Sequence, residues 1–213
     1  MASFMSRTAL FLLLSAVALF AAEAIPASRN FHVVQHRLDL AAEIGKFCQS
    51  TQNATLCTKI LQPYFEGIHF DQFKALDITL DATSEQAKLT LAAIDSLFFK
   101  KGLSKSTKDS LKICKDQYKS ILGSIKEAKA MVATKNVIEA KYKVSAVISF
   151  YEACSDSFDI GETIPFAAQS EPVFQIGGNC LDILAAMEKA LPARPVVMNS
   201  PPSPYSNVIG TIS

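Results

Sequence analysis

Five cysteines are the residues of this chain whose possible chemistry is easiest to judge from their spacing. They are Cys48, Cys57, Cys114, Cys154 and Cys180. The first two enclose eight residues in FCQSTQNATLC. Zinc ligands usually show a tighter cysteine spacing beside a second pair or histidines, and a redox pair is usually C-x-x-C. The spacing therefore favours a structural disulfide, provided that the chain reaches an oxidising compartment.

The start of the chain indicates such a compartment. Arg7 precedes an apolar run from Ala9 to Phe20, which leads into the small residues of AAEA. This order is typical of a secretory signal peptide, and we expect cleavage after Ala24. The run is shorter than the roughly 20 residues that cross a bilayer, which argues against a membrane anchor. The sequence thus predicts residues 1–24 as a signal peptide and a secreted, extracellular mature chain.

Secretion gives a meaning to a second short motif, which lies between the first two cysteines. Asn53, Ala54 and Thr55 form an Asn-x-Thr triplet. In the secretory pathway this triplet is an acceptor for N-linked glycans, provided that its asparagine is exposed. On that condition we expect glycosylation at Asn53.

Composition and motifs exclude several other functions. The chain has 21 Lys and Arg against 20 Asp and Glu, a net charge of +1, without a basic cluster, so nucleic acid is not an expected partner. No H-E-x-x-H helix, nucleophile elbow or glycine-rich phosphate loop occurs. The one close carboxylate group, Asp156, Asp159 and Glu162, lacks the spacing of a calcium loop. We therefore expect no enzyme, no metal site and no cofactor.

Four long stretches with helical periodicity must position these residues. Apolar side chains recur every three or four positions over about 71–100, 104–134, 136–158 and 173–191. The connections between the first three stretches are short, which makes neighbouring helices antiparallel. The sequence predicts an all-α fold, an up-and-down four-helix bundle. A short N-terminal helical hairpin within about 38–61, closed by the first disulfide, precedes it.

Helical periodicity also narrows the pairing of the cysteines, because four cysteines allow three pairings and spacing alone does not choose. Cys114 is in step with the apolar face of the second long helix, and Cys154 with that of the third. Both lie equally far from the centre of the turn between them, so an antiparallel hairpin brings them to the same height. We expect Cys114–Cys154 beside a local Cys48–Cys57 pair, with Cys180 as a free, buried thiol.

This cysteine pattern on a helical bundle resembles the plant invertase/pectin methylesterase inhibitor family. The likeness rests on Cys48-x8-Cys57, on LKICKDQYKSIL, on VSAVISFYEACSDSF and on an unpaired cysteine in the last helix. It covers about residues 38–191, which we expect to form the inhibitor domain. Residues 25–37 are then an N-terminal extension, and 192–213 are a proline-rich tail that we expect to be disordered.

The resemblance implies a secreted protein that binds a carbohydrate-active enzyme of the plant cell wall and blocks it. Members inhibit either pectin methylesterases, by covering the substrate cleft, or acid invertases. Invertase inhibitors typically carry Pro-Lys-Phe early in the third helix, where this chain has Val137, Ile138 and Glu139. We therefore expect a monomer in the apoplast that occludes a pectin methylesterase 1:1. The alternatives are an inhibitor of cell-wall or vacuolar acid invertase and a secreted binding module without inhibitory activity.

Four residues form the partner interface that we expect. Asp116 and Asp156 each follow a bridging cysteine by two residues, which turns them about 200° away from the buried seam of a helix. Ser120 and Gly123 continue the outward stripe from Asp116. The alternative interpretation is that all four are ordinary solvent-exposed surface.

Overall fold

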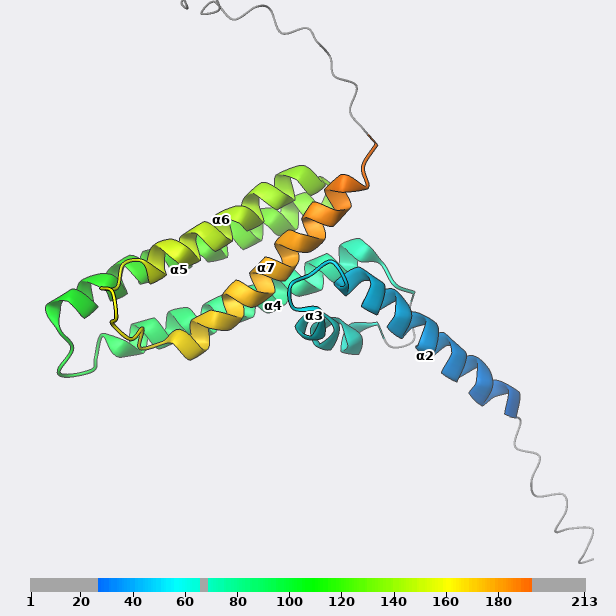
Figure 1. The fold of residues 1–213 in the computed structure, drawn as a ribbon, viewed down its shortest axis with the longest axis horizontal. Helices are drawn as coiled ribbons and strands as arrows, with labels where there is room; N and C mark the ends of the chain where they lie inside the picture. The colour runs from blue at the N-terminus through cyan, green and yellow to red at the C-terminus, as the bar shows by residue number, and fades with distance from the viewer. Residues whose placement is uncertain (1–26, 66–68, 193–213) are drawn as a thin grey trace, which may run out of the picture.

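A computed structural model describes residues 27–65 and 69–192, with only the backbone described for 27–37 (Figure 1). The expected signal peptide and the tail from residue 193 onward lie outside the described residues. Within them the structure contains helices and no strand. The elements are α2 (Ala27–Cys48), α3 (Ala54–Leu61), the 3-10 turn η1 (Gln62–Tyr64), α4 (Gln72–Leu97), α5 (Lys105–Ala133), α6 (Val137–Ser155) and α7 (Ala167–Lys189).

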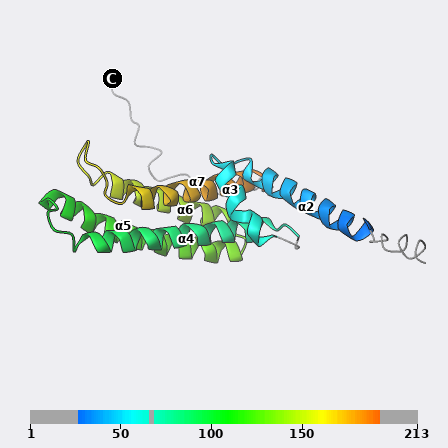
Figure 2. The same cartoon turned by 90° about the horizontal axis from the view of Figure 1, so that it is seen from below.

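Helices α4 to α7 form the predicted four-helix bundle, which confirms the all-α, up-and-down architecture (Figures 1 and 2). Helix α5 packs between α4 and α6, and α7 closes the bundle by packing against the same two helices. Helix α7 is therefore diagonal to α5. The interior is filled by aliphatic and aromatic side chains, among them the fully buried Leu76, Ile94, Ile121 and Tyr118. Such close packing fixes the relative position of the helices.

Polar side chains at the helix starts explain where α4, α5 and α6 begin. Asp71, Ser104 and Asn136 each accept a hydrogen bond from a backbone N–H in the first turn of α4, α5 and α6, over 2.8, 3.0 and 3.3 Å. These bonds satisfy donors that a helix start leaves free. The connection between α4 and α5 turns at Gly102, whose φ of +86° favours glycine.

The last helix begins earlier than the sequence predicts. The sequence predicts this helix from about residue 173, after a loop through Pro172 with Gly161 and Pro165 as helix breakers. In the structure α7 starts at Ala167 and includes Pro172. Proline has no N–H to donate to the carbonyl of Ala168, four residues before it. Side chains of α4 contact the next carbonyl of the same turn. The backbone carbonyl of Gln169 accepts hydrogen bonds from the side chains of Gln86 (2.9 Å) and Thr90 (2.7 Å). Contacts from another helix thus hold a turn that periodicity did not indicate.

The first helix of the N-terminal hairpin is longer than the short helix expected. Helix α2 has 22 residues and includes most of the expected extension 25–37. Its last three turns bury Leu40, Ile44 and Cys48 in the core, whereas Leu38 is exposed. The preceding part of α2 projects away from the bundle (Figures 1 and 2). The steps of four residues place Leu40, Ile44 and Cys48 on one face of α2, the face that packs against the core.

Candidate protein-binding surface

Two disulfides brace the structure, and the second joins the two helices that carry the expected interface. Cys48 and Cys57 are bonded with their Cα atoms 5.6 Å apart, and Cys114 and Cys154 with theirs 4.5 Å apart. All four side chains are buried. The first bond joins the end of α2 to α3 and the second joins α5 to α6. These are the two pairs that the sequence analysis expected, and the second holds the α5–α6 hairpin as one unit.

The fifth cysteine, Cys180 of α7, is a free thiol and fully buried. Burial raises its pKa to about 12, although the nearby hydroxyl of Thr83, 3.8 Å from the sulfur, acts in the opposite direction. The thiolate is the reactive form of cysteine. A thiol that is protonated and out of contact with solvent is part of the core and not a nucleophile.

The four expected interface residues lie on the outside of the α5–α6 hairpin. Asp116 and Gly123 are exposed on α5, with the half-buried Ser120 between them. Asp156 is exposed directly after α6, at its C-cap. The carboxylate of Asp116 pairs with Lys119 at 2.9 Å. The structure thus places these residues on the surface, and their contact with a partner stays a prediction.

The stripe on α5 is suited to close contact. The hydroxyl of Ser120 donates to the backbone carbonyl of Asp116 over 3.1 Å, which turns it back onto the helix. A Cβ added at Gly123 would meet nothing within 4 Å, so the backbone is open to solvent there. The stripe therefore offers one carboxylate and an uncovered stretch of helix, which a flat protein surface can approach without moving side chains.

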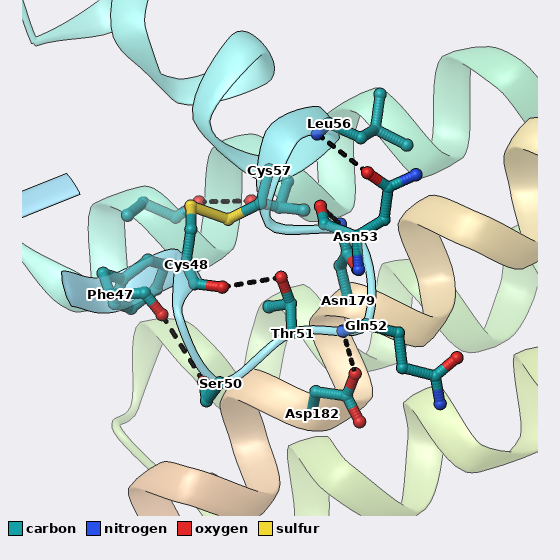
Figure 3. The surroundings of a disulfide bond; sticks show 12 residues. Phe47, Cys48, Ser50, Thr51, Gln52, Asn53, Leu56, Cys57, Asn179 and Asp182 are labelled. Carbon is teal, nitrogen blue, oxygen red and sulfur yellow. Dashed lines mark hydrogen bonds between the residues drawn. A yellow bond between two sulfur atoms is a disulfide. The ribbon is translucent and has the colours of Figure 1, made fainter. Parts of the chain in front are cut away.

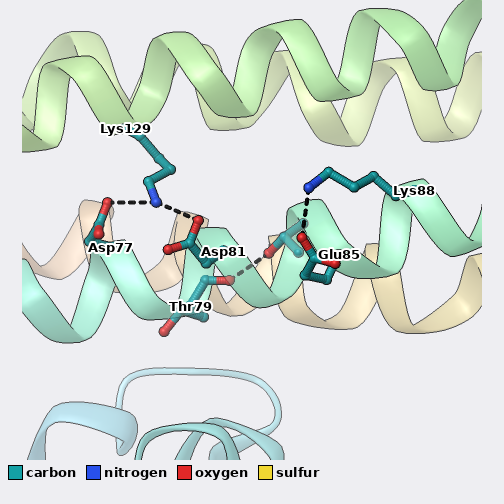
Figure 4. Close-up of polar contacts among 7 residues, drawn as sticks. Asp77, Thr79, Asp81, Glu85, Lys88 and Lys129 are labelled. Atoms are coloured by element: carbon teal, nitrogen blue, oxygen red, sulfur yellow. Dashed lines mark hydrogen bonds and ion pairs between the residues drawn. The ribbon is translucent and has the colours of Figure 1, made fainter. Parts of the chain in front are cut away.

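Ion pairs between helices hold this surface in place (Figure 4). Lys129 of α5 bonds the carboxylates of Asp77, at 3.2 Å, and Asp81, both on α4. Partial burial lowers the pKa of Lys129, but the hydrogen bonds and charges of Asp81 and Asp77 outweigh it, so the pKa lies above 10.5. Further pairs join neighbouring helices of the bundle: Lys115–Asp95, Lys143–Glu127 and Lys141–Glu188.

Two of the three clustered carboxylates, Asp159 and Glu162, hold the loop after α6 against the start of α5. Asp159 accepts from the hydroxyl of Ser106 over 2.9 Å, and Glu162 from that of Thr107 over 2.6 Å. Both donors belong to the first turn of α5, whose N-terminus attracts negative charge.

In residues 27–65 and 69–192 no group of three or more His, Cys, Asp or Glu side chains is arranged to hold a metal ion. None of the helices described there is long and apolar enough to cross a membrane.

Sequence reasoning missed the contacts that dock the N-terminal hairpin onto the bundle (Figure 3). The buried side chain of Asn179 on α7 accepts from the backbone N–H of Asn53 (3.1 Å) and donates to its carbonyl (3.0 Å). Beside it, Asp182 accepts from the N–H of Gln52 over 2.9 Å. The sequence does contain a sign of this contact. Asn179 is a polar residue next to Cys180 on the apolar face of α7, where polar side chains are rare unless they have a hydrogen-bond partner.

Comparison with known proteins agrees with this architecture. Residues 42–183 match the family model described as plant invertase/pectin methylesterase inhibitor. Pectinesterase inhibitor 1 of Arabidopsis thaliana is 28% identical over 116 residues, which are 54% of this chain and 64% of that protein. The matched part of the chain thus spans less than two thirds of that relative.

Two solved structures resemble the fold. A crystal structure of a mutant form of a pectin methylesterase inhibitor from Arabidopsis superposes with a TM-score of 0.58 at 25% identity, over 67% of this chain and 95% of that one. A second, of a pectin methylesterase inhibitor from Arabidopsis thaliana, gives 0.51 at 25% identity, over 68% and 95%. Because the family model covers well over half of the sequence, the chain belongs to the plant invertase/pectin methylesterase inhibitor family.

Proposed function

We propose that this chain inhibits a pectin methylesterase by binding across its substrate cleft in a 1:1 complex. The observation that carries the proposal is the bundle itself, which aligns with 95% of the chain in each of two crystal structures of pectin methylesterase inhibitors. The family name also covers inhibitors of plant invertase. The first turn of α6, where we expected Pro-Lys-Phe in an invertase inhibitor, has Val137, Ile138 and Glu139, so the pectin methylesterase is the preferred target.

The architecture suits inhibition by occlusion. A rigid surface loses little conformational entropy on binding, and the Cys114–Cys154 disulfide and the ion pairs between helices restrict this bundle. Helix α5 has 29 residues and is therefore about 43 Å long. An α5–α6 face of that length can bury the roughly 800 Å² that a stable complex needs from each partner. Asp116, Ser120, Gly123 and Asp156 are the proposed contacts on this face.

Secretion to the apoplast is part of the proposal. It is supported by the signal-peptide pattern of residues 1–24 and by two buried disulfides, since disulfides persist in oxidising compartments. The mature chain is then 25–213, and we propose that it acts as a monomer without a cofactor.

The target is tested by titrating oxidised residues 25–213 against a plant pectin methylesterase and an acid invertase in parallel. We expect methylesterase activity to fall to zero near one equivalent, with the invertase unaffected. Loss of invertase activity alone would reverse the choice of target. If both enzymes keep full activity across several isoforms, the chain is a secreted binding module without inhibitory activity.

The contact surface is tested by charge reversal. We expect Asp116→Lys and Asp156→Lys to weaken inhibition about tenfold each, which corresponds to about 1.4 kcal/mol of binding free energy. Glu43→Lys is the matched control, because Glu43 is exposed on α2 of the hairpin and undergoes the same change of charge. Equal inhibition by all three variants would mean that the acidic positions on α5 and after α6 are ordinary surface.

A further inference from the structure

A groove of about 360 Å³ lies between the hairpin and the bundle, beside the turn that links α2 to α3. One wall is formed by Gln52 and Asn53 of the turn, and the other by residues of α6 and α7, including Ile148, Phe174 and Gly178. A Cβ added at Gly178 would meet nothing within 4 Å, so the groove is open above this glycine. None of the proposed enzyme contacts lines it.

The side-chain amide of Asn53 contributes to this groove and is held in one orientation. Its Oδ1 accepts from the backbone N–H of Leu56 over 3.0 Å and caps α3 (Figure 3). Its Nδ2 therefore points the other way, 3.5 Å from Oε1 of Gln175 on α7. A glycan on Nδ2 replaces one of two hydrogens and leaves Oδ1 as an acceptor. The folded hairpin can thus keep its cap when Asn53 is modified.

The wall opposite Asn53 has the chemistry that a sugar ring binds. The half-buried ring of Phe174 packs on Tyr151 with the ring centres 5.0 Å apart. An aromatic face is electron-rich and attracts the weakly positive C–H groups of a sugar. At the edge, the carboxylate of Glu171 accepts from the amide of Gln175 over 3.1 Å, and both groups can bond hydroxyl or acetamido groups. An apolar floor with a few polar groups is typical of small-molecule sites.

We propose that Asn53 carries an N-linked glycan whose first sugar, an N-acetylglucosamine, lies in this groove against Phe174 and joins the hairpin to α7. The inference rests on the secretion that forms part of the proposed function. In the transfer, a bond forms between Nδ2 and the anomeric carbon of the sugar, and the bond from that carbon to the pyrophosphate of a lipid-linked donor breaks. The amide gives one proton to a base of the transferase, and the lipid pyrophosphate leaves.

The site lies where an added contact stabilises the fold. The hairpin meets α7 through the hydrogen bonds of Asn179 and Asp182 to the same turn. A sugar that contacts both walls extends this junction on its open side. Separation of the hairpin from the bundle would then also break the contacts of the sugar.

The test compares secreted forms of the full chain that differ only at the triplet. Thr55 is exposed, so Thr55→Ala removes the acceptor while Asn53 keeps its cap, and Thr55→Ser keeps the acceptor. We expect mass spectrometry to find Asn53 occupied in the wild type and in Thr55→Ser. We expect both to melt about 2–4 °C above Thr55→Ala, a shift typical of one added contact in a chain of this size. Trimming of the glycan to its first sugar should preserve the difference.

A second pair of variants tests the groove. Phe174→Leu removes the aromatic ring on which the sugar would lie. The glycosylated Phe174→Leu chain should therefore melt at the same temperature as the double variant that also carries Thr55→Ala. Any stability lost with the ring itself is common to both chains and cancels in this comparison. Gly178→Leu, which fills the open space, should also abolish the melting difference. An unoccupied Asn53 overturns the proposal, and so does a melting difference that survives both groove variants or is lost on trimming. None of these measurements uses a pectin methylesterase, so they are independent of whether the chain inhibits one.

Discussion

Removal of the Asn179 side chain is expected to release the N-terminal hairpin from the bundle. The amide makes two hydrogen bonds to the backbone of Asn53, 3.1 and 3.0 Å long, and only 1% of Asn179 is exposed. In Asn179→Ala both bonds are lost, and the N–H of Asn53 is left without this partner at a half-buried position. The carbonyl of Asn53 still accepts from the backbone N–H of Cys57 over 3.0 Å. The structure offers no other side chain of α7 with this geometry.

The size of the effect follows from these contacts. Each hydrogen bond contributes about 1 kcal/mol net, and a buried group left without a partner costs about 1–3 kcal/mol. Because solvent can reach part of the turn, we expect a total loss of about 2–4 kcal/mol in the free energy of unfolding. With a urea m-value of about 2 kcal/mol/M, the midpoint should fall by about 1–2 M.

Urea unfolding followed by circular dichroism measures the midpoint, and amide hydrogen exchange at Gln52 and Asn53 locates the change. Gln175→Ala is the control: it is exposed on the same helix, its contact with Asn53 is at the 3.5 Å limit, and its midpoint should move by less than about 0.3 M. If Asn179→Ala unfolds at the wild-type midpoint and leaves exchange in the turn unchanged, these bonds do not dock the hairpin.

Three further predictions concern the bundle. Replacement of both Cys114 and Cys154 by alanine should lower the free energy of unfolding by about 4 kcal/mol in urea titrations, because the bond closes a long loop of sequence separation 40. Cys180 should react with iodoacetamide near pH 8 only after unfolding, since its raised pKa lowers the thiolate fraction about 1000-fold; rapid native labelling contradicts its burial. Lys129→Met should cost about 0.5–1 kcal/mol at pH 7. Because the pKa of Lys129 is raised in the folded state, its contribution to the free energy of unfolding is fully present below pH 10.5 and is lost as pH rises through the folded pKa. The urea midpoints of the wild type and Lys129→Met should therefore converge in alkali.

Most of the fold could be predicted because it depends on local sequence patterns. Helical periodicity located α4, α5 and α6 to within a few residues. Their starts depend on local contacts, since Asp71, Ser104 and Asn136 each accept a hydrogen bond from a backbone N–H three residues away. The start of α7 could not be predicted in this way, because the turn before Pro172 depends on side chains of α4 that are about 80 residues away in sequence.

The candidate surface was predicted in part. Asp116 and Asp156 each follow a bridging cysteine by two residues, and the rotation of a helix over two residues turns them away from the buried seam. Both are exposed in the structure. The docking of the hairpin by Asn179 was not predicted, since its partner is a backbone turn more than 100 residues earlier. The groove beside Asn53 likewise exists only after α6, α7 and the hairpin are packed together.

The central claim, occlusion of a substrate cleft by the bundle, is tested most directly by steady-state kinetics of a plant pectin methylesterase at several concentrations of pectin and of oxidised residues 25–213. If the bundle occupies the cleft, pectin and inhibitor exclude each other, so the apparent KM should rise with inhibitor while kcat stays constant. A fall in kcat that saturating pectin does not reverse would contradict occlusion and place the contact outside the cleft. Unchanged KM and kcat would contradict inhibition itself.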